Sequence, residues 1–131
     1  MSGSDAKILI VDDDKTVRAS LERLLVGEGY RVTMARSGVD ALGILDQGEF
    51  ALVMLDLRMP QLGGMTVLQH LRTRHPNTPV IVMTGFPSIE NAKEAIELGA
   101  FDFLLKPLDP DTTRGVVSSA LASSPFRIQE R

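Results

Sequence analysis

The sequence predicts one α/β domain, built around a parallel sheet that carries helices on both faces. Strand-like apolar runs and helix-like segments alternate five times along the 131 residues. Residues 51–55 are apolar throughout, as expected of a strand that is covered on both faces. Such alternation is typical of right-handed βαβ units, in which a helix joins consecutive parallel strands.

Five segments predict the strands, and they are residues 7–11, 30–36, 51–55, 80–83 and 101–105. The second segment mixes polar and apolar residues, which indicates an edge strand. For a chain of this size we expect a flavodoxin-like, doubly wound (βα)5 fold with strand order 2-1-3-4-5. Its switch point, where such folds bind ligands, then lies between the first and third strands.

The predicted helices begin at capping residues and end at glycine or proline. Ser37 and Asp109 are the expected N-caps, Asp14 is a candidate for a third, and Pro110 favours a helix start. The residues expected to stop the helices are Gly27, Gly29, Gly48, Gly99 and, just beyond the third helix, Pro76.

Composition narrows the functional classes. A net charge of −3 and a pI near 5.3 argue against direct nucleic-acid binding by phosphate neutralisation. The chain has no cysteine, which fits a reducing cytoplasm. We find no apolar run long enough to span a membrane and no signal-peptide pattern, so we expect a cytoplasmic domain without membrane contact.

Three segments divide the chain. Residues 1–6 are expected to be disordered and tag-like, residues 7–122 to form the domain, and residues 123–131 to be a tail or the start of a linker.

Chemically reactive side chains stand at the ends of four predicted strands. Asp12 and Asp13 follow the first, Asp56 the third, Thr84 the fourth and Lys106 the fifth. Because parallel strands end at one edge of the sheet, these residues should lie close together. The sequence therefore predicts a charged site at this edge.

Clustered carboxylates favour a hard divalent cation, and Mg²⁺ is the usual one where phosphate is handled. The alternative is that Asp12, Asp13 and Asp14 only favour the positive end of the first helix. Asp56 at the same edge favours the metal site. Three carboxylates, Mg²⁺ and the ammonium of Lys106 sum to zero formal charge, which suits phosphoryl transfer to an aspartate.

Four motifs together resemble the receiver domain of two-component response regulators. They are ILIVDD at 8–13, LDLRMP at 55–60, VMTG at 82–85 and GAFDFLLKP at 99–107, in the order and spacing usual for that family. The resemblance covers about residues 7–122.

The resemblance implies a role for each matching residue. Asp56 would be the phosphoacceptor, and Asp13, Asp56 and the backbone carbonyl of Arg58 would bind Mg²⁺, with Asp12 acting mostly through metal-bound water. Thr84 and Lys106 would bind phosphoryl oxygens. The switch residues would be Thr84 and Phe103.

The resemblance also implies partners and regulation. The phosphoryl donor would be a histidine kinase or a histidine phosphotransfer protein, facing Lys15, Thr16, Arg18 and the loop at 107–109. The domain would be a switch that assists its own phosphorylation and dephosphorylation, not an enzyme with a separate substrate. The fourth helix, fifth strand and fifth helix would form its output face and a possible homodimer interface. A cis peptide is expected between Lys106 and Pro107.

Two positions depart from the family pattern. Gly63 stands where the family often has aspartate, which predicts a looser loop without loss of a catalytic group. Phe103 replaces the commoner tyrosine, so the switch would depend on ring packing without a hydroxyl hydrogen bond.

Three other functions compete with this interpretation. Asp12-x-Asp14-x-Thr16 fits the nucleophile motif of haloacid-dehalogenase-type phosphatases, with Asp12 as nucleophile, but the chain is short and Asp56 would be unexplained. An FMN carrier of the same fold should have a first loop rich in Ser, Thr and Gly, whereas aspartates repel phosphate. A degenerate receiver used as a scaffold is disfavoured because every phosphorylation residue is present.

Overall fold

The computed structural model describes residues 5–59, 61–85 and 89–124, without the side chains of residues 89 and 90. Strands and helices alternate in the order β1 Lys7–Val11, α1 Lys15–Gly27, β2 Arg31–Ala35, α2 Gly38–Leu45, β3 Leu52–Asp56, α3 Gly64–Arg74, β4 Val80–Thr84, α4 Ile89–Glu97, β5 Asp102–Leu105 and α5 Pro110–Ala122. The expectations for residues 1–4 and 125–131 lie outside the described residues. Residues 1–6 were expected to be disordered, but Ala6 is buried, and its carbonyl accepts a hydrogen bond from the Arg31 N–H.

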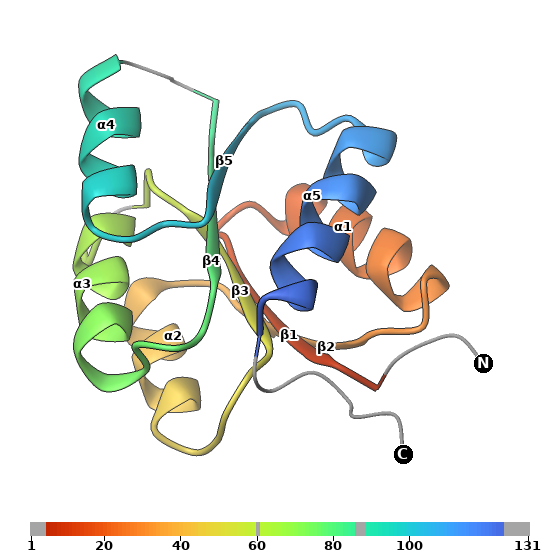
Figure 1. Ribbon diagram of the computed structural model, residues 1–131, viewed down its shortest axis with the longest axis horizontal. Coiled ribbons are helices and arrows are strands. Elements are labelled where there is room, and N and C mark those ends of the chain that lie inside the picture. Colours follow the sequence, from red (N-terminus) through yellow and green to blue (C-terminus); the bar gives the residue numbers. More distant parts are fainter. Residues whose placement is uncertain (1–4, 60, 86–88, 125–131) are drawn as a thin grey trace.

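The sheet confirms the predicted topology. All neighbouring strands are parallel, in the order β2-β1-β3-β4-β5 (Figure 1). Val11 pairs with Leu55, Asp56 with Met83 and Thr84 with Leu105, so the strands end nearly level. The residues at these ends therefore lie along one edge, as the sequence predicted.

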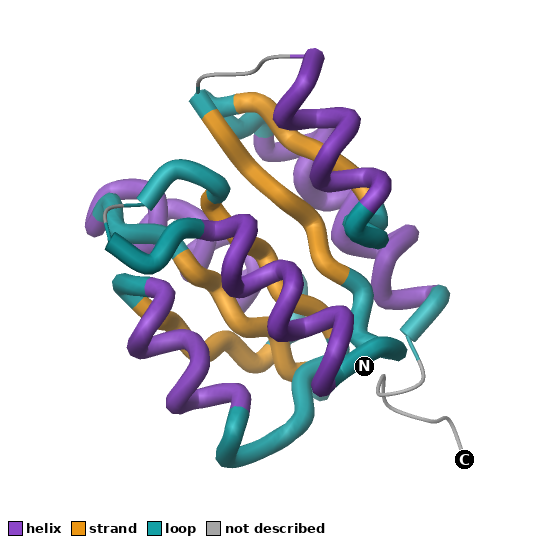
Figure 2. The backbone as a smooth tube through the Cα atoms, turned by 90° about the vertical axis from the view of Figure 1, so that its left-hand side faces the viewer, coloured by secondary structure: helices purple, strands orange, loops and turns teal. Residues whose placement is uncertain are grey.

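Two apolar layers cover the sheet. Alternate residues of the strands face opposite sides, so Leu9 and Val11 pack toward α2, α3 and α4, whereas Ile8 and Ile10 pack toward α1 and α5. Figure 2 shows the three helices of the first layer in front of the strands. Every residue of β3 and β4 is buried, which explains their nearly continuous apolar sequences.

Side-chain caps fix the starts of three helices, as predicted. Asp14 accepts hydrogen bonds from the backbone N–H groups of Thr16 and Val17 at the start of α1. Ser37 and Asp109 cap α2 and α5 in the same way. Gly63 precedes α3 and offers no side-chain cap.

Glycines close two of the helices as expected, with positive φ at Gly29 after α1 and at Gly99 after α4. The third helix ends at Arg74, before Pro76. The second helix ends at Leu45, three residues earlier than the Gly48 stop predicted from the sequence. The N–H of Gln47 bonds to the carbonyl of Ile44, so a tight last turn closes α2 without help from a glycine.

The connection from β3 to α3 folds back onto the strand. A Cβ atom on Gly64 would lie 2.3 Å from the carbonyl oxygen of Asp56 and 2.6 Å from the Cα of Leu57. Only glycine therefore allows α3 to begin directly beside Asp56. Among the described residues, no helix is long and apolar enough to cross a membrane.

Candidate functional site

Three carboxylates meet at the edge of the sheet where the sequence predicted them. Ligand oxygens of Asp12, Asp13 and Asp56 all lie within 4.8 Å of one another. Asp12 is fully buried and Asp56 is 3% exposed, whereas Asp13 is exposed. The cluster therefore has a buried floor and one member open to solvent.

Asp12 is held at each of its polar groups. Its N–H donates to the carbonyl of Ala35 on the neighbouring strand. Its Oδ1 accepts a hydrogen bond from the N–H of Asp14 at 2.9 Å, and its Oδ2 lies 2.8 Å from the Nζ of Lys106. A buried carboxylate needs such partners, since burial without them is costly.

Lys106 neutralises part of the cluster. Its Nζ contacts Asp12 and also lies 3.5 Å from the Oδ2 of Asp56. Burial lowers the pKa of Lys106, but its contacts with Asp12 and Asp56 outweigh that effect, so the pKa is raised overall and the ammonium stays charged. The peptide bond between Lys106 and Pro107 is cis, which confirms the prediction.

The ionised form of Asp56 is destabilised by its surroundings. Burial is the main reason that its pKa is raised to about 6, and the nearby charge of Asp12 adds to the effect. The backbone N–H of Arg58 donates to its Oδ1 over 3.2 Å and, with Lys106, partly opposes the rise in pKa. The ionised form is thus available at neutral pH, but it is less stable than in water.

The donor set fits a divalent metal ion. Three carboxylates with one ammonium leave two formal negative charges, which a divalent cation balances. Carboxylate oxygens are hard ligands of the kind that Mg²⁺ prefers. Burial is the main cause of the raised pKa of Asp56, and the charges of Asp12 and Asp13 raise it further, while Lys106 lowers it.

An open cavity of about 470 Å³ lies over the carboxylates. It is lined by Asp13, Asp14, Asp56, Arg58, Gly85 and Lys106. Among the described residues, a Cβ on Gly85 would meet only the Cβ of Lys106, at 3.7 Å, which is ordinary van der Waals contact.

The two predicted switch residues lie on adjacent strands. Thr84 is buried at the end of β4, next to the strand end that carries Asp56. Its carbonyl accepts a hydrogen bond from the N–H of Lys106. Phe103 is partly buried and packs against the core on the side of α2, α3 and α4.

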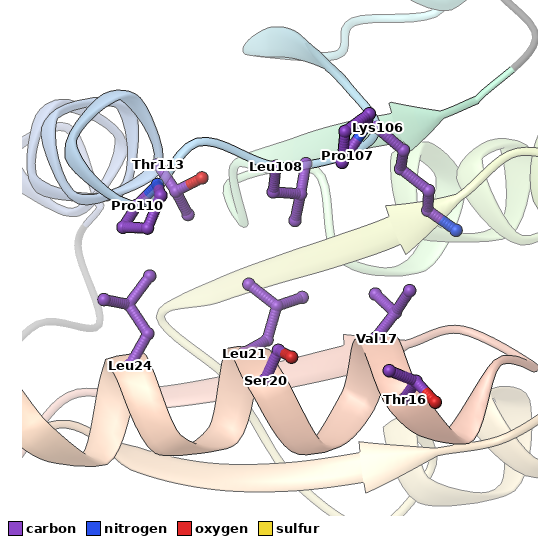
Figure 3. A pocket seen from close by; sticks show the side chains of 10 residues that line it. All are labelled: Thr16, Val17, Ser20, Leu21, Leu24, Lys106, Pro107, Leu108, Pro110 and Thr113. Atoms are coloured by element: carbon purple, nitrogen blue, oxygen red, sulfur yellow. The ribbon is translucent and has the colours of Figure 1, made fainter.

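A second cavity, of about 290 Å³, lies beside the site between α1 and the segment from Lys106 to Thr113. Figure 3 shows Leu21 and Leu24 of α1 facing Leu108 and Pro110 across this groove, with Lys106 at one end. The groove is mostly apolar and runs up to the charged site.

One contact of the site was not predicted from the sequence. Arg18, which was expected on the surface that faces the kinase, is half-buried, and its Nη1 donates to the backbone carbonyl of Asp12 over 2.8 Å. The available signal was its position four residues after the cap Asp14, from which a side chain can reach back over the helix start.

A family model described as the response regulator receiver domain matches residues 8–118. The chain belongs to this family. The acidic pocket of Asp12, Asp13 and Asp56 fits the phosphoacceptor function of receiver domains. Nothing favours the phosphatase alternative, in which Asp12 would be the nucleophile.

Curated relatives include longer regulators. The receiver domain is 43% identical over 122 residues to the transcriptional regulatory protein ZraR of Klebsiella oxytoca, covering 93% of this chain and 28% of that protein. It is 37% identical over 131 residues to the transcriptional regulatory protein GlrR of Escherichia coli K12, covering 100% of this chain and 30% of GlrR. The chain thus spans less than a third of these relatives.

Solved structures agree with the fold. The receiver domain of Francisella response regulator 1452 matches with a TM-score of 0.83 at 31% identity, over 89% of this chain and 97% of that chain. NtrX from Brucella abortus, in complex with ATP, matches with a TM-score of 0.86 at 33% identity, over 91% of this chain and 27% of that chain.

Replacing Asp56 by asparagine is expected to stabilise the metal-free domain at neutral pH. The pKa of Asp56 is about 6 in the folded state and 3.8 ordinarily, so folding favours the protonated form. The group therefore destabilises the fold increasingly as pH rises from about 4 to about 6. One pKa unit corresponds to about 1.4 kcal/mol. The change in the free energy of unfolding caused by Asp56→Asn should therefore be more favourable at pH 7.5 than at pH 4, by on the order of 2–3 kcal/mol.

Urea unfolding in EDTA at both pH values measures this difference. Asp46→Asn, at an exposed position just after α2, controls for the loss of one negative charge. The same change in stability for Asp56→Asn at both pH values would show that the buried carboxylate is not under strain.

Proposed function

We propose that Asp56 accepts a phosphoryl group from a phosphohistidine of a histidine kinase or a histidine phosphotransfer protein, and that this modification changes the partner surface of the domain. The observation that carries the proposal is the environment of Asp56. It is a buried carboxylate with a raised pKa, next to one ammonium and two further carboxylates, and it lines an open cavity.

Mg²⁺ is the proposed cofactor. Asp13, Asp56 and the backbone carbonyl of Arg58 would bind it, and Asp12 would contact its water ligands. When bound, the ion supplies positive charge that offsets the carboxylates and the incoming phosphoryl oxygens. The N–H of Arg58 already holds Asp56 by a hydrogen bond, which keeps this loop beside the carboxylate.

The chain's own groups supply most of the positioning. An oxygen of Asp56 forms a bond to phosphorus while the P–N bond of the phosphohistidine breaks and its electron pair returns to the imidazole. Lys106 and the hydroxyl of Thr84 would bind the phosphoryl oxygens, where charge must be stabilised. The same groups would assist hydrolysis of the acyl phosphate, so the domain would act as a self-assisted switch and not on a separate substrate.

Acetyl phosphate with Mg²⁺ is expected to add one phosphoryl group to the wild-type chain, because the site provides both a nucleophile and charge compensation. Asp56→Asn should show no addition, and the matched control Asp46→Asn should react like wild type. Intact-mass measurement with and without EDTA checks this.

Peptide mapping of the trapped acyl phosphate locates the modified residue. Equal incorporation into wild type and Asp56→Asn would remove Asp56 as acceptor. Modification at Asp12 would support the phosphatase alternative instead.

The groove between α1 and the start of α5 is the proposed docking surface for the phosphohistidine donor. Thr16, Ser20 and Leu24 line one side, Leu108 and Pro110 line the other, and Lys106 lies at its end. A partner helix lying in an apolar groove that leads to the phosphoacceptor would deliver its histidine into the acidic cavity.

Ser20→Trp is expected to fill this groove without touching the carboxylates, because Ser20 is exposed on α1 and lines the cavity. Transfer from a cognate phosphohistidine donor should slow by about tenfold or more, which corresponds to about 1.4 kcal/mol of lost contact energy. The rate of modification of Ser20→Trp by acetyl phosphate should stay unchanged. The control is Gln69→Trp, on the exposed face of α3, which should react with the phosphohistidine donor and with acetyl phosphate at the wild-type rates. Equal slowing with both donors would argue for a damaged site.

The proposed switch connects Thr84 to Phe103. Movement of Thr84 toward a bound phosphoryl group would vacate space into which the Phe103 ring turns, and β5 and α4 would readjust. The exposed apolar residues of this region are Ile96, Phe101 and Leu105, whose exposed fractions are 50%, 40% and 54%. They support an output and homodimer face formed by α4, β5 and α5. Phosphorylation shifts the balance only by its different affinity for the two arrangements.

Beryllofluoride with Mg²⁺, a mimic of the phosphoryl group, is expected to change NMR shifts from Asp56 through Thr84 to α4 and β5. Sedimentation of the same sample should show self-association that Leu105→Asp weakens, because that variant places a charge on the apolar face. Shift changes confined to the loops around the carboxylates would contradict the switch. A wild-type monomer at all concentrations would contradict the dimer.

A further inference from the structure

Arg18 joins α1 to the loop that carries the acidic pair. Its backbone N–H donates to the carbonyl of Asp14 at 3.0 Å, in the first turn of α1. Its side chain turns back toward the helix start, and Nη1 donates to the backbone carbonyl of Asp12 at 2.8 Å. Helical side chains lean toward the N-terminus of their helix, which makes this reach natural.

The carbonyl that Arg18 holds belongs to the peptide unit between Asp12 and Asp13. Because a peptide unit is planar, fixing its oxygen also fixes the direction in which the chain enters Asp13. The other polar groups of Asp12 have partners elsewhere. Within the described part of the chain, no hydrogen bond holds the side chain of Asp13. The direction of its carboxylate therefore depends on the conformation of the backbone at Asp13.

Neither an ion pair nor the helix explains the position of Arg18. Among the described residues, its guanidinium is within ion-pair distance of no carboxylate. A cation near a helix start also faces the positive end of the helix dipole, which is unfavourable. The hydrogen bond to the loop carbonyl is the contact that accounts for the half-buried side chain.

We propose that Arg18 is a positioning residue, which holds the Asp12–Asp13 peptide so that the Asp13 carboxylate is presented to a divalent cation beside Asp56. This inference rests on the proposed function, in which Asp13 binds Mg²⁺. A purely electrostatic role predicts the opposite effect, because a cation near the cluster repels Mg²⁺ and its removal should tighten metal binding. The direction of the change therefore separates the two roles.

Mg²⁺ affinity of the whole chain, measured by calorimetry, tests the inference. Arg18→Met keeps the aliphatic stem and should weaken Mg²⁺ binding about tenfold, the lower end of the loss seen when groups that orient metal ligands are removed. Arg18→Lys keeps one charged donor and should lose less, about threefold, because a lysine does not reproduce the guanidinium geometry. Arg23→Met, on the exposed side of α1, should bind like wild type.

NMR of the metal-free Arg18→Met variant gives a second measurement. The amide signals of Asp13 and Asp14 should shift while that of Asp56 stays in place. Equal or tighter Mg²⁺ binding by Arg18→Met would overturn the inference. If this variant does not fold, Arg18→Lys decides the question, and wild-type affinity in it overturns the inference. Failure of the proposed function is distinct, since the wild-type chain itself would then not bind Mg²⁺.

Discussion

The mutual repulsion of three carboxylates at one edge of the sheet is the constraint on which the rest of this structure depends. Parallel strands that end nearly level bring Asp12, Asp13 and Asp56 within 4.8 Å of one another. Two unit charges about 4 Å apart repel by roughly 1 kcal/mol in water and by several times that near a protein surface. Lys106 relieves part of this repulsion. The pKa of Asp56 stays raised, mainly because the group is buried and then because of the nearby charge of Asp12. The negative charge that remains favours the binding of a divalent cation. In the proposed function of this receiver domain, the cation in turn favours the binding of a phosphoryl group.

Asp12 links this charge to two other strands and to the first helix. Asp12 contacts the strand β2, the loop before α1, the end of β5 and the side chain of Arg18. Lys106 is shared between Asp12 and Asp56, and its backbone N–H bonds to the carbonyl of Thr84. In the proposed function, a phosphoryl group on Asp56 competes with Asp12 for the ammonium. A change at the acceptor would then reach the ends of β4 and β5 through contacts that already exist in the unmodified domain.

Much of the fold and of the site was predictable because both depend on the ends of strands. The nearly continuous apolar sequences of β3 and β4 match two fully buried strands, and the reactive residues Asp56 and Thr84 are the last residues of these strands. Caps were predictable because Ser37 and Asp109 offer oxygens at the right positions. The end of α2 was not, since backbone bonds close it before Gly48. The direction of Arg18 was also hidden, because periodicity locates a residue on a helix without saying which backbone group its side chain reaches. Gly64 shows the same limit: the close approach of α3 to Asp56 exists only in the folded chain.

The central claim, that the carboxylate cluster is an unsatisfied site for one divalent cation, is tested most directly by the stability of the wild-type domain in salt. The free energy of unfolding should be measured against MgCl₂ and against NaCl at equal ionic strength. We expect MgCl₂ to stabilise the fold along a one-site binding curve, by about 2.7 kcal/mol at a hundredfold excess over the dissociation constant. NaCl should give a smaller rise that does not follow such a curve, because it only screens the charges. Equal stabilisation by the two salts would contradict the claim.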